Sequence, residues 1–173
     1  MGMGGAGMAS LAKLLSGMGF QVSGCALTRG ASVQELEALG MECMLGHSGD
    51  HVERFDPHLL IYSSAVDEAC DELEAARARG VRTVGRGRAL SWLFNAASGV
   101  GVAGTHGKTT TTSMIAEILL EADWDPTVTV GGMMRDIGGN IRVGQSENFI
   151  AEACEYTNSF LSFYPTIEVV LNV

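Results

Sequence analysis

Residues 99–123 read GVGVAGTHGKTTTTSMIAEILLEAD, and this stretch decides the fold. The small and β-branched run from Gly99 to Ala103 predicts a buried strand. Gly104 to Gly107 then predicts a tight loop, and 108–123 predicts a helix with one apolar face. The residues of that face are Ile115, Ile118, Leu119 and Ala122. A strand, a loop and a helix in this order are typical of a parallel α/β unit.

The same alternation continues on both sides of this stretch. Further strands are expected near 20–25, 41–45, 59–63, 127–130, 148–152 and 167–172, and further helices near 7–18, 32–39, 68–79 and 86–97. This alternation predicts an α/β fold, in which a Rossmann-like parallel-sheet domain (1–97) precedes a P-loop-type α/β domain (98–173). No helix follows the last expected strand. We therefore expect the second domain to be incomplete and the chain to be a fragment of a longer enzyme.

Composition limits the classes of function. The chain has 173 residues, of which 46% are hydrophobic, and a net charge of −9. This balance predicts a folded protein and argues against nucleic-acid binding. No apolar run approaches the roughly 18 residues of a membrane-spanning helix, so we expect no membrane insertion. The four cysteines show no CxxC pairing and are interpreted as reduced thiols, which makes the cytoplasm the expected location.

The loop before the central helix has the pattern of a phosphate-binding site. Backbone amides and the helix dipole can hold phosphates there, a lysine can reach the terminal phosphate, and a threonine hydroxyl can bind Mg²⁺. Val102 stands where the general GxxxxGK[ST] pattern has its first glycine. A glycine-rich turn without a ligand is the alternative, and the strand–loop–helix context favours the phosphate site. The predicted ATP-binding residues are Gly104, Thr105, His106, Gly107, Lys108, Thr109 and Thr110.

Two further stretches carry possible chemistry. Glu152 and Glu155 follow an expected strand, at the edge where open α/β sheets bind ligands, so a carboxylate there can hold a Mg²⁺ ion that bridges phosphates. The alternative is a solvated turn. Near the start, residues 2–8 read GMGGAGM, which is either a tight strand-to-helix turn or a second phosphate loop.

Other conspicuous residues have simpler interpretations. Trp92 and Phe94 are expected in the core rather than against a cofactor. The acidic run 67–74 is expected to be a solvated helix face. His47, His51 and His58 lack the spacing of a zinc motif, so no zinc site is predicted from the sequence.

GTHGKTTT at 104–111 resembles the ATP loop of the Mur ligases, whose loop also lacks the first glycine. AEACEY at 151–156, the opening GMGGAGM and the SSAV segment at 63–66 resemble further pieces of that family, in the same order. The chain departs from the family pattern at Cys25-Ala26, where the family tends to have Ser-Asp, and no strand precedes the first glycine loop. The resemblance covers the chain nearly from end to end.

The resemblance implies an ATP-dependent ligase of peptidoglycan synthesis, with ATP and Mg²⁺ as cofactors. The His106 form of the loop resembles the branch that joins L-alanine to UDP-N-acetylmuramate through an acyl phosphate. By resemblance Lys108 is the catalytic residue, and Thr109 and Glu152 hold the metal ion. Glu155 is implied to be a substrate-side or structural residue. The residues implied to receive the UDP-sugar are Gly4, Gly5, Gly7, Ser63 and Ser64.

Three alternatives stay open at this point. A sister ligase attaches a recycled tripeptide to the same UDP-sugar, and the opening GMGGAGM favours the alanine-adding branch over it. A nucleotide-binding module without catalysis would bind ATP and release no phosphate. A small P-loop kinase would need an acceptor site and a lid, for which the sequence offers no candidate. The missing C-terminal parts of its own enzyme are expected partners, so the chain alone is expected to be inactive.

Overall fold

The computed structural model describes residues 1–153 and 161–172, and its contacts divide the chain into two compact units. Unit 1 comprises Met1–Ala89 and unit 2 comprises Leu90–Val173. Helix α5 (Arg86–Asn95) contributes residues to both units. No helix in the described ranges combines the length and the apolar character that crossing a bilayer requires.

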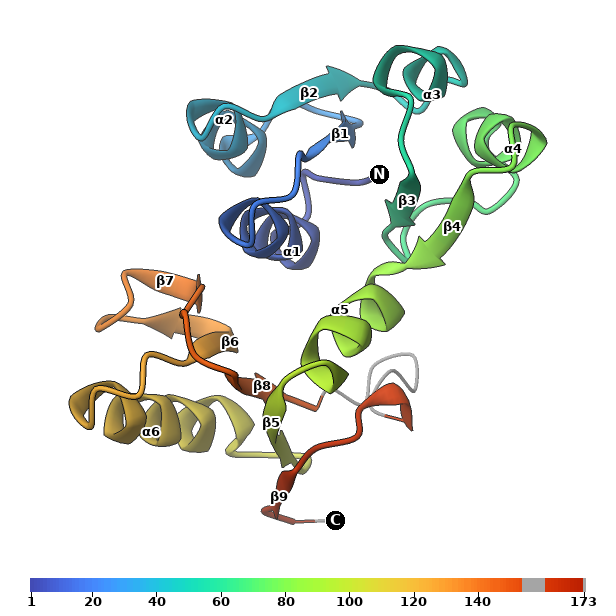
Figure 1. Cartoon of the computed structure of the whole chain (residues 1–173). Coiled ribbons are helices and arrows are strands. Elements are labelled where there is room, and N and C mark those ends of the chain that lie inside the picture. Colours follow the sequence, from blue (N-terminus) through green and yellow to red (C-terminus); the bar gives the residue numbers. More distant parts are fainter. Residues whose placement is uncertain (154–160, 173) are drawn as a thin grey trace. The chain divides into compact units, whose positions relative to one another are not determined.

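Unit 1 alternates short strands and helices (Figure 1). Its strands are β1 (Ser23–Ala26), β2 (Glu42–Leu45), β3 (Leu59–Tyr62) and β4 (Arg82–Gly85), and its helices are α1 (Ala6–Gly17), α2 (Ala31–Ala38), α3 (Asp50–Phe55) and α4 (Asp71–Ala78). Strand β1 pairs with β2 and strand β3 pairs with β4, both in parallel. Parallel pairs joined through helices are the strand–helix–strand units that the alternation in the sequence predicts.

Residues 1–3 connect the two strand pairs of unit 1. The backbone nitrogens of Gly2 and Met3 both donate to the Cys25 carbonyl at 2.9 Å. On the other side, the nitrogen of Met1 donates to the Ile61 carbonyl at 2.6 Å, and the Ser63 nitrogen donates to the Met1 carbonyl at 3.3 Å. The backbone before the glycine loop therefore lies between β1 and β3, which is the central position of a doubly wound sheet.

Unit 2 contains one five-stranded sheet in the order β7-β6-β8-β5-β9. Its elements are β5 (Ser98–Ala103), α6 (Lys108–Glu121), β6 (Thr127–Met134), β7 (Gly139–Arg142), β8 (Asn148–Glu152) and β9 (Ile167–Val170). Strand β5 pairs in parallel with both β8 and β9, and β6 pairs in parallel with β8. Strand β7 is antiparallel to β6. The carboxyl ends of the four parallel strands therefore meet at one edge.

Each unit has its own apolar core. In unit 1, Val52, Leu60 and Leu73 pack together with Cys25. In unit 2, α6 packs on the sheet through Ala116 against residues of β6 and β8. Phe94 is fully buried and stacks at an angle on Phe149 and Phe163, with ring centroids 5.6 Å and 5.0 Å apart.

The predicted α/β class with parallel sheets is confirmed, whereas several elements differ from expectation. The short elements α3, β4 and β7 are not predicted, because their sequences DHVERF, RTVG and GNIR lack an apolar run such as the LLIY of the equally short β3. The expected apolar face of the central helix is partly wrong, since Ile118 is 65% exposed and Ala122 is also exposed. Thr112 and Ala116 face the sheet instead, because small side chains let a helix approach a sheet closely.

Candidate functional site

The loop Gly104–Gly107 joins the carboxyl end of β5 to the N-terminus of α6 (Figure 1). Gly104 has a φ of 137° and Gly107 a φ of 84°, values that L side chains rarely adopt. A Cβ atom at Gly104 would also lie 3.2 Å from the backbone nitrogen of Asn172. Both glycines are therefore required for the turn that places the free amides of the first turn of α6 at the loop.

Asn172 holds the outer part of this loop. Its side-chain oxygen accepts hydrogen bonds from the backbone nitrogen of Thr105 at 2.8 Å, from the Thr105 hydroxyl at 2.6 Å and from the backbone nitrogen of His106 at 3.1 Å. Its side-chain nitrogen donates to the His106 carbonyl at 3.1 Å. Sequence reasoning missed this residue. The available signal was an amide side chain just beyond an expected strand, which in a parallel sheet ends at the same edge as the predicted loop.

Lys108 lies over its own loop. The ammonium group donates to the Gly104 carbonyl in a short hydrogen bond and to the Thr105 carbonyl at 3.4 Å. An ammonium group has three donors on a flexible stem, so it can exchange these carbonyls for phosphate oxygens without any change in the backbone. Of the other predicted loop residues, His106 and Thr110 are exposed, and the His106 ring nitrogen Nδ1 lies 3.2 Å from the Thr105 hydroxyl.

Thr109 and Glu152 both border the glycine pair Gly131-Gly132 of β6. The Glu152 carboxylate accepts a hydrogen bond of 2.7 Å from the backbone nitrogen of Gly131, and a Cβ atom at Gly131 would lie 2.9 Å from its other oxygen. A Cβ atom at Gly132 would lie 3.2 Å from the methyl group of Thr109. The absence of side chains on this pair leaves space for the Glu152 carboxylate and the Thr109 side chain beside the phosphate loop. Hydroxyl and carboxylate oxygens are ligands that Mg²⁺ prefers.

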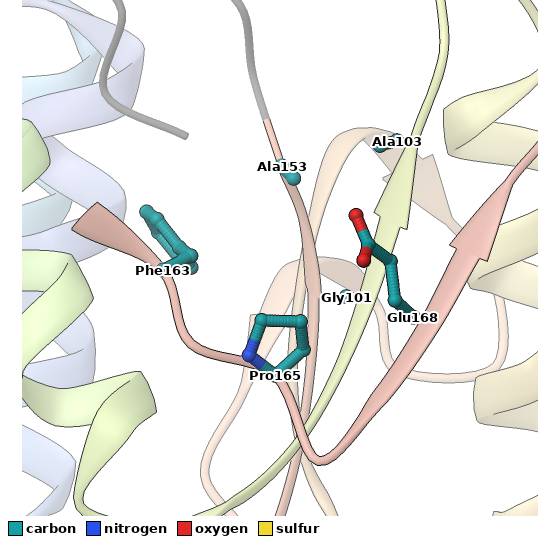
Figure 2. Close-up of a pocket in the computed structure, with 6 residues that line it drawn as sticks. All are labelled: Gly101, Ala103, Ala153, Phe163, Pro165 and Glu168. Carbon is teal, nitrogen blue, oxygen red and sulfur yellow. The ribbon is translucent and has the colours of Figure 1, made fainter. Parts of the chain in front are cut away.

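Glu155 lies outside the described residues. A small cavity of about 40 Å³ lies nearby, between the strands β5 and β9 and the segment 163–165 (Figure 2). Its lining residues are Gly101, Ala103, Ala153, Phe163, Pro165 and Glu168. A liquid water molecule occupies about 30 Å³, so this cavity is too small for a nucleotide. The loop surface itself is the candidate phosphate site.

A second glycine loop opens unit 1. Gly4, Gly5 and Gly7 are exposed, and Gly5 directly precedes the first residue of α1. Atoms built as Cβ at Gly4 and Gly5 would be 3.6 Å from their nearest neighbours, which is ordinary contact. The fold itself therefore does not require glycine at these two positions. Glycine there leaves the backbone accessible at a helix N-terminus, where anions bind.

Side chains from two other strand ends lie beside this loop. Ser63 follows β3, and a Cβ atom at Gly2 would lie 3.0 Å from the Cβ atom of Ser63. Ser64 is exposed in the turn that follows. Arg86, the first residue of α5, places its guanidinium group on Gly7, 3.3 Å from a Cβ atom built there. Arg86 was not predicted. The available signal was a cationic residue at the first position of the helix expected at 86–97.

Comparisons with known proteins find similarity to Mur ligases along the whole chain. The family model described as "Mur ligase family, catalytic domain" matches residues 1–98, and "Mur ligase middle domain" matches residues 102–171. Two curated relatives are the UDP-N-acetylmuramate–L-alanine ligases of Agathobacter rectalis, at 45% identity, and Clostridium tetani, at 41% identity. Each aligns with 100% of this chain, which spans only 38% of the relative's length.

Two solved structures superpose closely on the chain. The UDP-N-acetylmuramate:L-alanyl-gamma-D-glutamyl-meso-diaminopimelate ligase from Neisseria meningitides has a TM-score of 0.89 and 30% identity, over 99% of this chain and 58% of that one. The UDP-N-acetylmuramate–alanine ligase from Thermotoga maritima has a TM-score of 0.77 and 29% identity, over 98% of this chain and 39% of that one.

Proposed function

The chain belongs to the Mur ligase family, and from this premise we propose that it forms part of an ATP-dependent ligase that joins L-alanine to UDP-N-acetylmuramate. The curated relatives at 41–45% identity carry that name. Unit 1 supplies the UDP-sugar site and unit 2 the ATP-phosphate site. We place the functional domain boundary near residue 97, just after α5 and eight residues beyond the point where the contacts divide the two units. Both substrates are intracellular nucleotides, so the enzyme works in the cytoplasm, at a step of peptidoglycan precursor synthesis.

The observation that carries this proposal is the arrangement of Thr109 and Glu152 beside the Lys108 loop. In the proposed reaction, ATP phosphorylates the lactyl carboxylate of the UDP-sugar to an acyl phosphate. The amino group of L-alanine then attacks the acyl carbon, and phosphate leaves. Thr109 and Glu152 would hold a Mg²⁺ ion, which would supply positive charge to the phosphate oxygens when bound.

Lys108 has the electrostatic role in this mechanism. The first turn of α6 presents backbone amides to the phosphates. The Lys108 ammonium group stabilises the negative charge on the phosphoryl group during its transfer. Asn172 keeps the Thr105–His106 segment in place through its side-chain amide. A loop fixed before ATP arrives loses less conformational entropy on binding.

In unit 1, the glycine loop receives the UDP diphosphate. Gly4, Gly5 and Gly7 leave the backbone accessible, Ser63 and Ser64 offer hydroxyl groups, and the Arg86 guanidinium supplies a positive charge. A guanidinium group recognises phosphate oxygens through two parallel hydrogen bonds. That local charge offsets the unfavourable net charge of −9.

A second candidate is the ligase that attaches a tripeptide to the same UDP-sugar. It is favoured by the superposition on the Neisseria meningitides enzyme, whose TM-score of 0.89 exceeds the 0.77 of the alanine ligase from Thermotoga maritima. Sequence identity to those two structures is nearly equal, at 30% and 29%. The curated relatives at higher identity favour the alanine enzyme, which we therefore retain.

The test uses a full-length enzyme that carries these 173 residues. Phosphate release with UDP-N-acetylmuramate is measured with L-alanine or with the tripeptide, across a range of Mg²⁺ concentrations. Turnover only with the tripeptide would replace the alanine assignment. We expect Lys108→Ala to lower kcat roughly 10³-fold at every Mg²⁺ concentration.

The metal ligands have a different signature from the lysine. Glu152→Gln removes the negative charge of one proposed metal ligand, and Thr109→Val removes the hydroxyl group of the other, both at nearly constant size. Their loss of turnover should therefore shrink as the Mg²⁺ concentration is raised. Glu155→Gln is the matched control and should leave the Mg²⁺ dependence unchanged. If Glu155→Gln were the metal-sensitive variant and Glu152→Gln were not, the assignment of the two acids would be reversed.

A further inference from the structure

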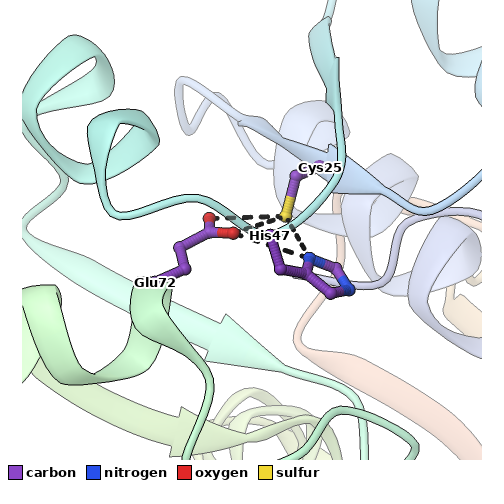
Figure 3. A group of neighbouring side chains, drawn as sticks. All are labelled: Cys25, His47 and Glu72. Carbon is purple, nitrogen blue, oxygen red and sulfur yellow. Dashed lines mark hydrogen bonds and ion pairs between the residues drawn. The ribbon is translucent and has the colours of Figure 1, made fainter.

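A buried polar cluster in unit 1 has no role in the proposed ligase reaction. It comprises Cys25 of β1, His47 in the loop after β2, and Glu72 in the first turn of α4. The three side chains point toward one another from three different elements (Figure 3). Cys25 is 0% exposed and Glu72 is 3% exposed, so the cluster lies inside the unit.

The distances between the donor atoms are close to those in a metal-ion site. Cys25 Sγ lies 3.1 Å from His47 Nδ1 and 3.0 Å from Glu72 Oε2, and His47 Nδ1 lies 3.5 Å from the same Glu72 oxygen. Tetrahedral zinc, with bonds of about 2.0–2.3 Å, holds its ligand atoms roughly 3.3–3.6 Å apart. Small side-chain movements of a few tenths of an ångström would therefore accommodate an ion.

The Glu72 carboxylate is the costly member of the cluster. A buried carboxylate requires an opposite charge or several hydrogen bonds. Within the described residues, the ion-pair and hydrogen-bond partners recorded for its two oxygens are the Cys25 thiol and two histidines, His47 and His51. No arginine or lysine is among these partners. The Met1 ammonium group interacts electrostatically with Cys25 and Glu72, but its hydrogen bond goes to the Ile61 carbonyl. A divalent cation would supply a positive charge in direct contact with the carboxylate.

His51 has a supporting position. This histidine of α3 is 3% exposed, and its Nδ1 lies 3.3 Å from Glu72 Oε2. A group that hydrogen-bonds a metal-binding carboxylate from behind fixes its orientation and raises metal affinity. The cluster thus has both the ligands of a metal site and a residue that orients one of them.

We propose that Cys25, His47 and Glu72 bind one divalent metal ion of the zinc class, with His51 orienting the Glu72 carboxylate. A thiolate and an imidazole select zinc over magnesium, so this site differs in chemistry from the Mg²⁺ site of unit 2. The second oxygen of Glu72 or a water molecule completes the four-coordinate geometry that zinc prefers. The ion ties β1, the loop after β2 and α4 together, and so stabilises unit 1.

Metal binding has a proton balance that can be measured. The Cys25 thiol donates a hydrogen bond of 3.0 Å to Glu72 Oε2, so it carries its proton while no ion is bound. Formation of the sulfur–metal bond breaks the S–H bond and releases that proton to solvent. No oxidation or reduction takes place. The competing interpretation is a metal-free hydrogen-bond network, which binds no ion and releases no proton.

The experiment uses the 173-residue chain, stripped of metal with a chelator under reducing conditions. Co²⁺ is titrated first because a cobalt–thiolate bond gives a charge-transfer band in the near ultraviolet, and Zn²⁺ is then added as a competitor. We expect the band to saturate at one Co²⁺ per chain and to disappear with Zn²⁺. Calorimetry in two buffers of different ionisation enthalpy should give about one proton released per ion at pH 8.

Variants then locate the ion. Cys25→Ser should abolish the thiolate band, and His47→Gln should weaken Zn²⁺ binding. His51→Gln should weaken it roughly 10–100-fold and keep the band at saturating Co²⁺. The matched controls are Cys43→Ser and His58→Gln, which change the same residue types outside the cluster and should leave both the band and the affinity unchanged.

Two outcomes would overturn the proposal. One is a parent chain that gives no thiolate band at stoichiometric Co²⁺, because the cluster would then be a hydrogen-bond network only. The other is a band that survives Cys25→Ser, because the ion would then lie elsewhere. Far-ultraviolet circular dichroism checks that the variants fold. If Cys25→Ser does not fold, two results still decide the question. One is the Co²⁺ titration of the parent chain, and the other is the Zn²⁺ affinity of His47→Gln, a change at a half-buried position.

Discussion

The contact between Phe94 and Gly99 fixes the strand that carries the phosphate loop, and a double-mutant cycle can test it. A Cβ atom at Gly99 would lie 2.4 Å, 2.5 Å and 2.9 Å from three atoms of the Phe94 ring, far inside normal contact. The ring is fully buried, so it has no free space into which it can move. Gly99→Ala alone should therefore destabilise unit 2 by about 1–3 kcal/mol, the usual cost of overpacking.

Removal of the ring reverses the sign of the Gly99→Ala effect. Phe94→Ala should cost about 3–5 kcal/mol, the usual range for a buried phenylalanine. In that background the added methyl group enters the space that the ring vacates. Alanine is also better than glycine inside a strand by roughly 0.5–1 kcal/mol. The double variant should thus be no less stable than Phe94→Ala, which corresponds to a coupling free energy of at least about 1–3 kcal/mol.

The assay is urea denaturation followed by tryptophan fluorescence. The chain has two tryptophans, Trp92 and Trp124, and both belong to unit 2, so the signal reports this unit alone. Gly139→Ala combined with Phe94→Ala is the control pair, because a Cβ atom at Gly139 would have its nearest neighbour 4.0 Å away. The control pair should be additive. Additivity within about 0.5 kcal/mol for the Phe94–Gly99 pair as well would refute the reasoning.

Three further predictions concern single residues. Arg86→Ala should weaken UDP-N-acetylmuramate binding roughly 10–100-fold, the loss of one charged hydrogen-bonding group, as measured by calorimetry, with the exposed Arg54→Ala as control; equal affinities would exclude Arg86 from the site. Asn172→Ala should weaken MgATP binding about fivefold or more because it frees the Thr105–His106 segment; unchanged binding would contradict the proposed clamp. The hydrogen bond from Arg142 and that from the Gln145 nitrogen lower the pKa of Asp125. A lowered pKa contributes stability above the ordinary value of about 4 and loses it in more acid solution. Asp125→Asn should therefore destabilise unit 2 at pH 7, with a difference that narrows below pH 4 in urea titrations; a constant difference would contradict this.

The local patterns of the sequence predict most of the fold. The strand, loop and helix at 98–121 are predicted because each has its own signal within a few residues: a small apolar run, two glycines and a helical period. Helix α3 and the strands β4 and β7 were missed because they contain no apolar run, whereas the equally short β3 consists of one (LLIY).

The site residues also fall into two groups, those that are contiguous in the sequence and those that only the fold brings together. The loop Gly104–Thr110 is contiguous in sequence, so its chemistry can be predicted without a structure. Asn172 is 67 residues from Thr105, and Glu72 is 47 residues from Cys25, so only the sheet topology brings these pairs together. The acidic run 67–74 shows the limit most clearly. It was expected to be a solvated helix face, but one of its acidic residues, Glu72, is buried against a thiol and two histidines.

The topology of unit 2 has a consequence for the order of events during synthesis. Unit 1 pairs strands that are close in sequence, such as Leu59 with Arg82. Strand β5, by contrast, can pair only after the much later strands β8 and β9 have been synthesised. Thr105 leaves the ribosome 67 residues before Asn172. At translation speeds of about 5–20 residues per second this is an interval of roughly 3–13 s. The phosphate loop is therefore among the first parts of unit 2 to be made and among the last to acquire its native contacts.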